Sequence, residues 1–368
     1  MLNSLKIFFI PSFAPVFFNI VMILSMLVLP GYFISKGIEP ILSLGVGVFL
    51  GGLAQALVQF PLILKNNMGP VIPKKIFSKQ TKKVFILLGP GLLGFAASQI
   101  NLVINTVLAS STIVGAVSWL SFSFRLFQLP VGILSVSIGN SNLVHFSNAW
   151  KAGDKKEATN LLASSYFLSF VLVIPAMVAL ISCSYEMVNI IFERGKFGAE
   201  STVMTSLALK WYALGLPAYS IYKIFVPTFY AIDKQKIPVY CSIFGIIINI
   251  LFCVFLTPIY GFEILAIGTT LSIFLNTLLQ GILIKKNLEM ELGQFINLRV
   301  FKLILAGFTS FGIIFYLKTF ISFNGENFFV RASILASYLV IIALSYFSMV
   351  VLFGEREIVQ GVIRRFKR

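Results

Sequence analysis

Long apolar runs alternate with short polar connectors along the whole chain. Each run holds roughly 20 residues or more, the number that an α-helix needs to cross the hydrocarbon core of a bilayer. We expect ten spans, at Ile7–Leu29, Ile41–Leu64, Val84–Ala109, Val117–Leu143, Ala158–Ile181, Thr202–Tyr230, Pro238–Leu256, Ile264–Ile284, Val300–Phe320 and Ala332–Phe353. The pattern therefore predicts an all-α, polytopic membrane helical bundle.

The composition excludes other classes of protein. Hydrophobic residues make up 58% of the 368 residues and charged residues 11%, whereas a soluble chain carries about 25% charged residues. A soluble enzyme is therefore excluded. The strands of an outer-membrane barrel alternate polar and apolar residues, and the runs here are continuous, so a barrel is excluded as well. No connector exceeds about 25 residues, which leaves no room for a soluble domain.

The basic residues gather on one side of the predicted bundle. If the spans alternate in direction, 21 of the 29 lysines and arginines fall on one face and five on the other, with Arg125, Lys210 and Lys223 inside spans. Loops rich in lysine and arginine stay cytoplasmic, so both termini should be cytoplasmic. The net charge of +16 therefore indicates contact with anionic membrane lipids and not with nucleic acid. The basic tail Glu355–Arg368 is expected to lie on the cytoplasmic surface.

Arg125 and Lys223 are the candidate binding cations within the spans. A guanidinium in a membrane helix costs about 2.5–3.5 kcal/mol on insertion scales, so Arg125 should face a wet cavity or a partner. The alternative is that it reaches an interface along its aliphatic stem. Lys223 suits an anion or a backbone carbonyl beside Pro227, and Lys210 an interfacial anchor.

The other polar residues within the spans are mostly amides, and no acid lies mid-span. Gln99 and Gln128, with nearby asparagines, complete an inventory that suits an anionic substrate with hydroxyl or amide groups, although amides also bridge helices. Helix kinks are expected at Pro90, Pro130, Gly132, Pro217 and Pro227.

Catalysis and cofactors find no support in the sequence. The three cysteines lack metal-ligand spacing and His145 is the single histidine. The connector Lys65–Lys83 has six lysines and neither an acid nor a histidine. We expect no enzyme, no metal and no cofactor. The segment Met1–Ile10 has no small-residue cleavage site, so no cleaved signal peptide is expected.

Four segments, in order and spacing, resemble the MurJ/MviN family of lipid II flippases. They are Leu88–Ser110, Gly115–Leu120 together with Arg125–Gly139, Ile191–Phe197 and Lys223–Asp233. The family belongs to the multidrug/oligosaccharidyl-lipid/polysaccharide exporter superfamily and has fourteen helices. Matched in register, the ten spans correspond to helices five to fourteen, so the first four helices are expected to be absent.

The resemblance implies a division of the chain and a function. Residues 1–83 would be the remainder of the N-terminal lobe, 84–286 the C-terminal six-helix lobe, 287–353 a final helix pair forming a groove for a lipid tail, and 354–368 the basic tail. The implied activity is movement of lipid II from the inner to the outer leaflet of the bacterial inner membrane by alternating access. The substrate would be linked to undecaprenyl pyrophosphate.

The resemblance also assigns roles to single residues. Arg125 matches the family's cavity arginine and Lys223 a basic position on its tenth helix. A sodium site of some members matches Asn105, Asn249, Cys253 and Thr269, but two carboxylates are replaced by Asn105 and Cys253, so no sodium is expected.

Three accounts of the shortened fold remain open: a misplaced start, a separate chain supplying the missing helices, or an inactive remnant acting at most as a membrane scaffold. Another exporter of the superfamily, for polysaccharide lipids or drugs, is the alternative function. Drug export would predict buried acids, which the spans lack.

Overall fold

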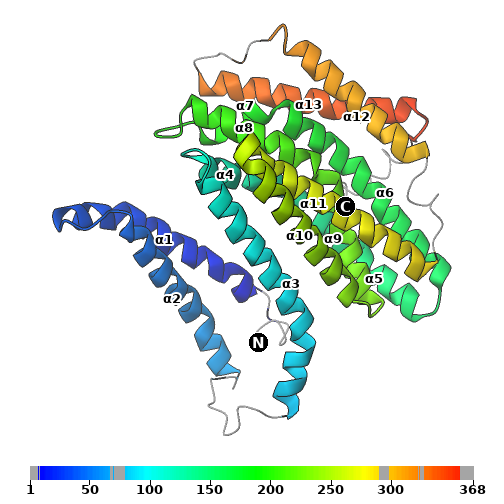
Figure 1. Ribbon diagram of the computed structural model, residues 1–368, viewed down its shortest axis with the longest axis horizontal. Helices are drawn as coiled ribbons and strands as arrows, with labels where there is room; N and C mark the ends of the chain where they lie inside the picture. Colours follow the sequence, from blue (N-terminus) through cyan, green and yellow to red (C-terminus); the bar gives the residue numbers. More distant parts are fainter. Residues whose placement is uncertain are drawn as a thin grey trace. The chain divides into compact units, whose positions relative to one another are not determined.

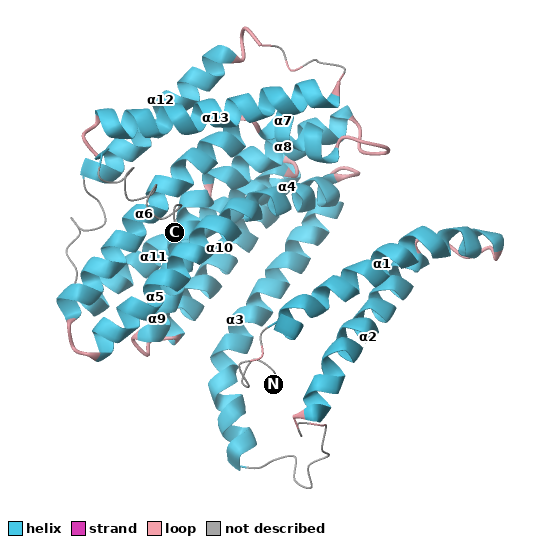
Figure 2. Cartoon of the chain, turned by 180° about the vertical axis from the view of Figure 1, so that it is seen from behind, coloured by secondary structure: helices cyan, strands magenta, loops and turns pink. Residues whose placement is uncertain are grey.

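The computed structural model describes residues 7, 9–66, 69, 79–289, 298–321, 323 and 327–356. These residues form α-helices, one π-helical segment and connecting loops (Figures 1 and 2). By its internal contacts the chain divides into a first unit, Met1–Lys82, and a second unit, Lys83–Arg368. Beyond Arg356, the predicted basic tail lies outside the described residues.

Seven of the described helices are long and apolar enough to cross a membrane, and each coincides with a predicted span. They are α1 (Phe9–Ser35), α2 (Leu42–Lys65), α6 (Lys155–Ser182), α10 (Lys236–Tyr260), α11 (Glu263–Leu288), α12 (Leu298–Leu317) and α13 (Phe328–Leu352). The continuous apolar runs were thus a sufficient signal for these elements.

The other three predicted spans fall on helices outside this set of seven, and two of these spans are divided into shorter helices. The first is α3 (Lys79–Ser110), and the second divides into α4 (Ala116–Pro130), the π-helical segment η2 (Val131–Ser135) and α5 (Val136–Lys151). The third divides into α8 (Ala199–Leu214) and α9 (Leu216–Ala231). Proline has no N–H for the helical ladder, so Pro130 and Pro217 account for the interruptions. The short helix α7 (Ser184–Phe192) was not predicted.

The first unit is a pair of helices in close contact. A Cβ atom added at Gly51 of α2 would lie 2.8 Å from the carbonyl oxygen of Phe18 in α1, and one at Gly47 would lie 3.0 Å from the Cβ of Ser25. Glycine at these two positions lets the backbones approach, as is usual between membrane helices. Most other side chains of the pair are exposed or half-buried.

The core of the second unit surrounds α6. Its buried residues, which include Leu162, Val171, Val173 and Val178, occur on all sides of the helix, as expected for a helix that is packed by neighbours all round. Helices α5, α8, α9 and α12 pack against it. The final helix pair approaches α6 closely at Gly307 of α12, where an added Cβ would lie 2.6 Å from a methyl group of Ile174.

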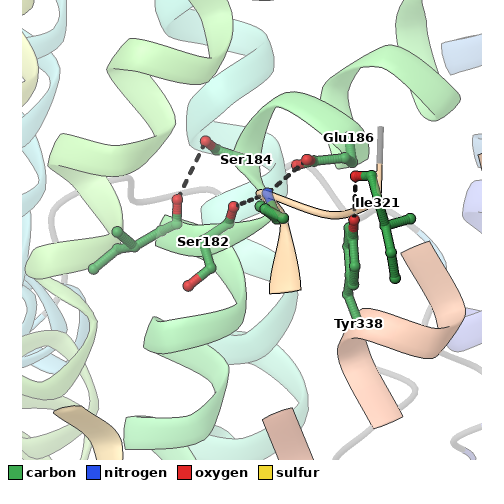
Figure 3. Close-up of polar contacts among 7 residues, drawn as sticks. Ser182, Ser184, Glu186, Ile321 and Tyr338 are labelled. Carbon is green, nitrogen blue, oxygen red and sulfur yellow. Dashed lines mark hydrogen bonds and ion pairs between the residues drawn. The ribbon is translucent and has the colours of Figure 1, made fainter. Parts of the chain in front are cut away.

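A buried ion pair attaches the final helix pair to α6 and α7. Lys318, which follows α12, contacts Glu186 of α7 at 2.5 Å and donates a hydrogen bond to the carbonyl oxygen of Ser182. Its ammonium also lies 5.4 Å from the centre of the Tyr338 ring on α13, while the Tyr338 hydroxyl donates to the carbonyl oxygen of Ile321 (Figure 3). The pair therefore joins four elements at one end of the bundle.

We expect the substitution Glu186→Gln to destabilise the second unit. It leaves the ammonium of Lys318, whose side chain is 25% exposed, without its counter-charge, and an uncompensated group of this kind costs about 1–3 kcal/mol. Thermal unfolding of the detergent-solubilised chain should show a midpoint several degrees lower. Glu200→Gln, at an exposed site, is the matched control, and equal midpoints for the two variants would contradict a structural role for the ion pair.

Candidate functional site

Helix α4 has one buried face and one exposed polar face. Trp119, Ser123 and Phe127 are buried against the second unit. The exposed polar residues Ser118, Ser121, Arg125 and Gln128 recur at intervals of three or four residues, so they lie along one side of the helix. We call these four residues the α4 polar face.

The buried side of α4 holds the helix in place. The helix begins after Gly115, whose φ of +101° and contact with the Trp119 ring both require glycine. The hydroxyl of Ser123 donates to the carbonyl oxygen of Thr205 in α8, at 3.0 Å. The Phe127 ring lies 5.4 Å from the Tyr219 ring of α9. Arg125 therefore projects from a well-packed support.

Arg125 itself is exposed. Within the part of the chain that the structure describes, its side chain forms no ion pair and no hydrogen bond; the ion pairs there join Glu355 to Arg299 and Lys302, and Glu186 to Lys318. A guanidinium in a membrane helix needs water or an anion. The α4 polar face is thus a candidate binding surface for an anion.

Lys223 lies in a different environment from Arg125. It is half-buried on α9, and its ammonium lies 5.9 Å from the ring centres of both Tyr219 and Tyr222. Tyr219 contacts Phe127, which is about 200° around α4 from Arg125 at 100° per residue. The structure therefore does not bring the two cations together.

The two glutamines also differ in position. Gln128 lies on the α4 polar face, about one turn beyond Arg125, and is exposed. Gln99 is exposed on α3, and no contact links it to Arg125 among the described residues. Of the four predicted substrate-binding residues, only Arg125 and Gln128 share a surface.

Three of the five predicted kink residues lie at or near a change of helix type. Pro130 ends α4, and η2, which contains Gly132, follows directly. Such π-helical turns are frequent at functional sites. Pro217 lies in the first turn of α9 after the break at Gly215, and Pro227 lies inside α9. Pro90 falls within α3, where its side chain is outside the described residues.

A cluster of amides joins α3 to α10. Asn249 of α10 is 1% exposed, and its Nδ2 atom donates to Oδ1 of Asn101, at 2.7 Å, and to Oδ1 of Asn105, at 3.5 Å. The thiol of Cys253 donates to Oδ1 of Asn249, at 3.4 Å. Thr269 instead donates to the carbonyl oxygen of Leu265 in its own helix. Sequence reasoning gave Asn101 no role in this cluster, although its four-residue spacing from Asn105 places both on one face.

The amide cluster does not suit a sodium ion. Its side chains are neutral amides and a thiol, so no carboxylate balances the charge of a cation there, and a thiol is a poor ligand for a hard cation. The Oδ1 atoms of Asn101 and Asn249 already accept hydrogen bonds from the cluster. These contacts assign Asn105, Asn249 and Cys253 to packing between α3 and α10.

An apolar cavity of about 970 Å³ lies between α6, α9, α11 and α12. We call it the α6–α12 cavity. Its walls include Phe170, Ile221, Phe274 and Phe308. Along α6 the wall runs from Tyr166 to Ile181, about 22 Å at 1.5 Å per residue. Of the final helix pair, α12 contributes to the described wall and α13 does not.

Comparison with known proteins shows the family to which the chain belongs. The family described as "Lipid II flippase MurJ" matches residues 1–352 of the chain. The chain belongs to the MurJ lipid II flippase family. MurJ proteins are transporters and not enzymes, and this chain is accordingly a multi-pass membrane protein.

Individual relatives give the extent of the similarity. The probable lipid II flippase MurJ of Buchnera aphidicola subsp. Acyrthosiphon pisum is 34% identical over 274 residues, which cover 74% of this chain and 52% of that protein. The lipid II flippase MurJ of Burkholderia cenocepacia is 30% identical over 368 residues, covering 96% and 69%. The chain thus spans about half to two-thirds of the length of these two MurJ relatives.

A solved structure of lipid II flippase MurJ in an inward closed conformation superposes with a TM-score of 0.76 and 24% identity. The match covers 97% of this chain and 70% of that one. The chain therefore has the MurJ fold over nearly its whole length, as the resemblance predicted.

We expect Gly268→Ala to disturb the amide cluster. An added Cβ would lie 2.6 Å from Sγ of Cys253 and 2.7 Å from Oδ1 of Asn249, and overpacking of this kind costs about 1–3 kcal/mol. The unfolding midpoint should fall. At Gly312 of α12 an added Cβ meets nothing within 4 Å, so Gly312→Ala should leave the midpoint unchanged or raise it. A cluster unimportant for packing would make the two variants alike.

Proposed function

We propose that this chain takes part in moving lipid II, a peptidoglycan precursor linked to undecaprenyl pyrophosphate, across the bacterial inner membrane by alternating access. Arg125 meets the diphosphate of the substrate, and the observation that carries the proposal is its exposed position, without a partner among the described residues, on the α4 polar face. The proposal includes the predicted orientation with both termini cytoplasmic.

The chemistry of the α4 polar face fits a lipid-linked sugar diphosphate. A guanidinium presents N–H donors in a planar fork that matches two phosphate oxygens at once. Ser121 and Gln128, each about one turn from Arg125, supply hydroxyl and amide groups for the sugar and peptide parts of the headgroup. Lys223 and Gln99 serve as further polar contacts outside this face, reached at other stages of transport.

The α6–α12 cavity fits the hydrocarbon part of the same substrate. Its wall is almost entirely apolar, and each Å² of apolar surface removed from water stabilises the bound state by about 25 cal/mol. An isoprenoid chain has no polar group that needs a partner there. In this proposal, the lobe at 84–286 holds the headgroup, and the pair at 287–353 contributes to the tail site through α12.

The proposal also covers the shorter length of the chain. The chain matches about half to two-thirds of the length of the two MurJ relatives, and the full transport cycle uses the further helices of such a protein, whether they belong to the same polypeptide or to another. In the first unit, α1 and α2 bury few of their side chains between themselves, which leaves apolar surface for packing against such helices.

Binding measurements on the full chain test the role of Arg125. We expect Arg125→Ala to weaken binding of lipid II roughly tenfold or more, because a hydrogen bond to a charged group contributes about 1.5–3 kcal/mol. Binding of undecaprenol, which lacks the diphosphate, should not change. Native mass spectrometry in a non-ionic detergent measures both ligands.

Lys210→Ala is the matched control, because Lys210 is an exposed cation on α8, about 200° around that helix from Tyr212, which contacts Phe124 of α4. It should bind lipid II as the unmodified chain does. If Arg125→Ala and Lys210→Ala bind lipid II equally well, Arg125 is not the diphosphate contact. If the unmodified chain prefers undecaprenol, the proposed substrate is wrong.

A further inference from the structure

Lys285 is the single charged residue in the described wall of the α6–α12 cavity. It lies in the last turn of α11 and is half-buried. The neighbouring Lys286 is exposed and absent from the cavity wall, because consecutive residues project 100° apart around a helix. One lysine of the pair is thus turned toward the cavity and the other away from it.

The remaining polar groups of the wall are mostly engaged. The hydroxyl of Thr277 donates to the carbonyl oxygen of Ala218, and that of Thr270 donates to the carbonyl oxygen of Trp211. Lys285 has no ion pair and no hydrogen bond with any residue that the structure describes.

The position of Lys285 along the cavity is at one end. The part of the wall formed by α11 runs from Thr270 to Lys285, about 22 Å at 1.5 Å per residue. The part formed by α6 ends at Tyr166. Lys285 and Tyr166 are on the same side, because each is nearer to a connector that the charge pattern predicts to be cytoplasmic. Figures 1 and 2 show α6, α11 and α12 in the same part of the second unit. A long apolar cavity with one cation at its end matches an amphiphile with an anionic head.

We propose that Lys285 binds the phosphate of an isoprenoid phosphate lipid whose chain occupies the α6–α12 cavity. This rests on the proposed function and deepens it: Lys285 captures the lipid phosphate at the cytoplasmic end of the cavity before the headgroup reaches Arg125. The aromatic wall, with Phe170, Phe274 and Phe308, accepts the branched, unsaturated chain. Lys285 is therefore a positioning residue for loading.

The alternative occupant is an ordinary membrane phospholipid. It presents the same phosphate chemistry to Lys285 but carries two acyl chains on one head, whereas an isoprenoid phosphate carries one chain. The experiment therefore measures undecaprenyl phosphate and undecaprenol, with phosphatidylglycerol as the competitor.

The substitution Lys285→Met removes the charge and keeps an apolar stem of similar length. In native mass spectrometry of the full chain, we expect it to weaken binding of undecaprenyl phosphate roughly tenfold, the loss of one charged contact, and to leave binding of undecaprenol unchanged. Lys286→Met makes the same change of charge one residue away, outside the cavity, and should bind both lipids normally. Equal effects of the two variants would overturn the proposal.

A second variant locates the chain of the lipid. Gly281 lies in the cavity wall, and an added Cβ there makes only an ordinary contact of 3.5 Å with Phe225. Gly281→Leu therefore fills the cavity without a backbone clash, and it should weaken binding of both lipids. If neither is weakened, the chain of the lipid lies elsewhere and the proposal fails. Displacement by phosphatidylglycerol at equal concentration would likewise exclude an isoprenoid phosphate as the preferred occupant.

Arg125→Ala separates this inference from the proposed function. It should leave binding of undecaprenyl phosphate unchanged, because the monophosphate is held at Lys285. If Lys285→Met weakens this binding while Arg125→Ala fails to weaken lipid II binding, the cavity proposal stands and the role of Arg125 falls. If instead Arg125→Ala weakens lipid II binding and Lys285→Met leaves binding of undecaprenyl phosphate unchanged, the role of Arg125 stands and the role of Lys285 falls.

Discussion

A guanidinium does not stay in hydrocarbon without water or a counter-ion, and this constraint on Arg125 organises the second unit. Arg125 projects from α4 because the opposite side of that helix is packed by Trp119 and Phe127. The same packing excludes a retreat of the side chain into the protein. The exposed side of α4 must therefore border a polar space when the helix lies in a membrane, and a transporter of anionic lipids needs such a space.

Other cations of the chain have surroundings that differ from those of Arg125. Lys318 has a carboxylate, a carbonyl oxygen and an aromatic ring around it, so it serves the attachment of α12 and α13 to the core. Lys223 lies beside two tyrosine rings. Arg125 and Lys285 have no such partners among the described residues; Lys285 lies in the wall of the α6–α12 cavity, and Arg125 is exposed on α4. The paired cation Lys318 thus stabilises the fold, and the unpaired cations Arg125 and Lys285 are the ones that we propose for binding.

The sequence was enough to predict most of the fold. Hydropathy locates helices such as α6 and α10 because the bilayer requires a continuous apolar run for each crossing. It did not reveal α7, whose ends depend on where single residues interrupt the backbone ladder. The break at Gly215 has no hydropathy signal either, although the kink expected at Pro217 lies beside it. The motifs around Arg125 and Lys223 indicated the family, because their order and spacing are properties of the sequence itself.

The candidate site was less predictable than the fold. Arg125 follows from composition alone, because a charge within a span is rare. Its separation from Lys223 depends on which faces of α4 and α9 meet, and the apolar runs do not specify that. Glu186 and Lys318 belonged to connectors in the sequence and became partners through packing of segments 132 residues apart. Lys285 was counted only as a cytoplasmic charge, and its place in a cavity wall required the structure.

Cysteine labelling of α4 in intact membranes tests the central claim most directly. The native thiols of Cys183, Cys241 and Cys253 are buried, so background reaction with a charged, membrane-impermeant thiol reagent should be low. Ser121→Cys and Gln128→Cys, on the α4 polar face, should react rapidly, and the buried Ser123→Cys should not. If Ser121→Cys and Gln128→Cys are as unreactive as Ser123→Cys, the face carrying Arg125 borders lipid and not a wet cavity, and the account is contradicted.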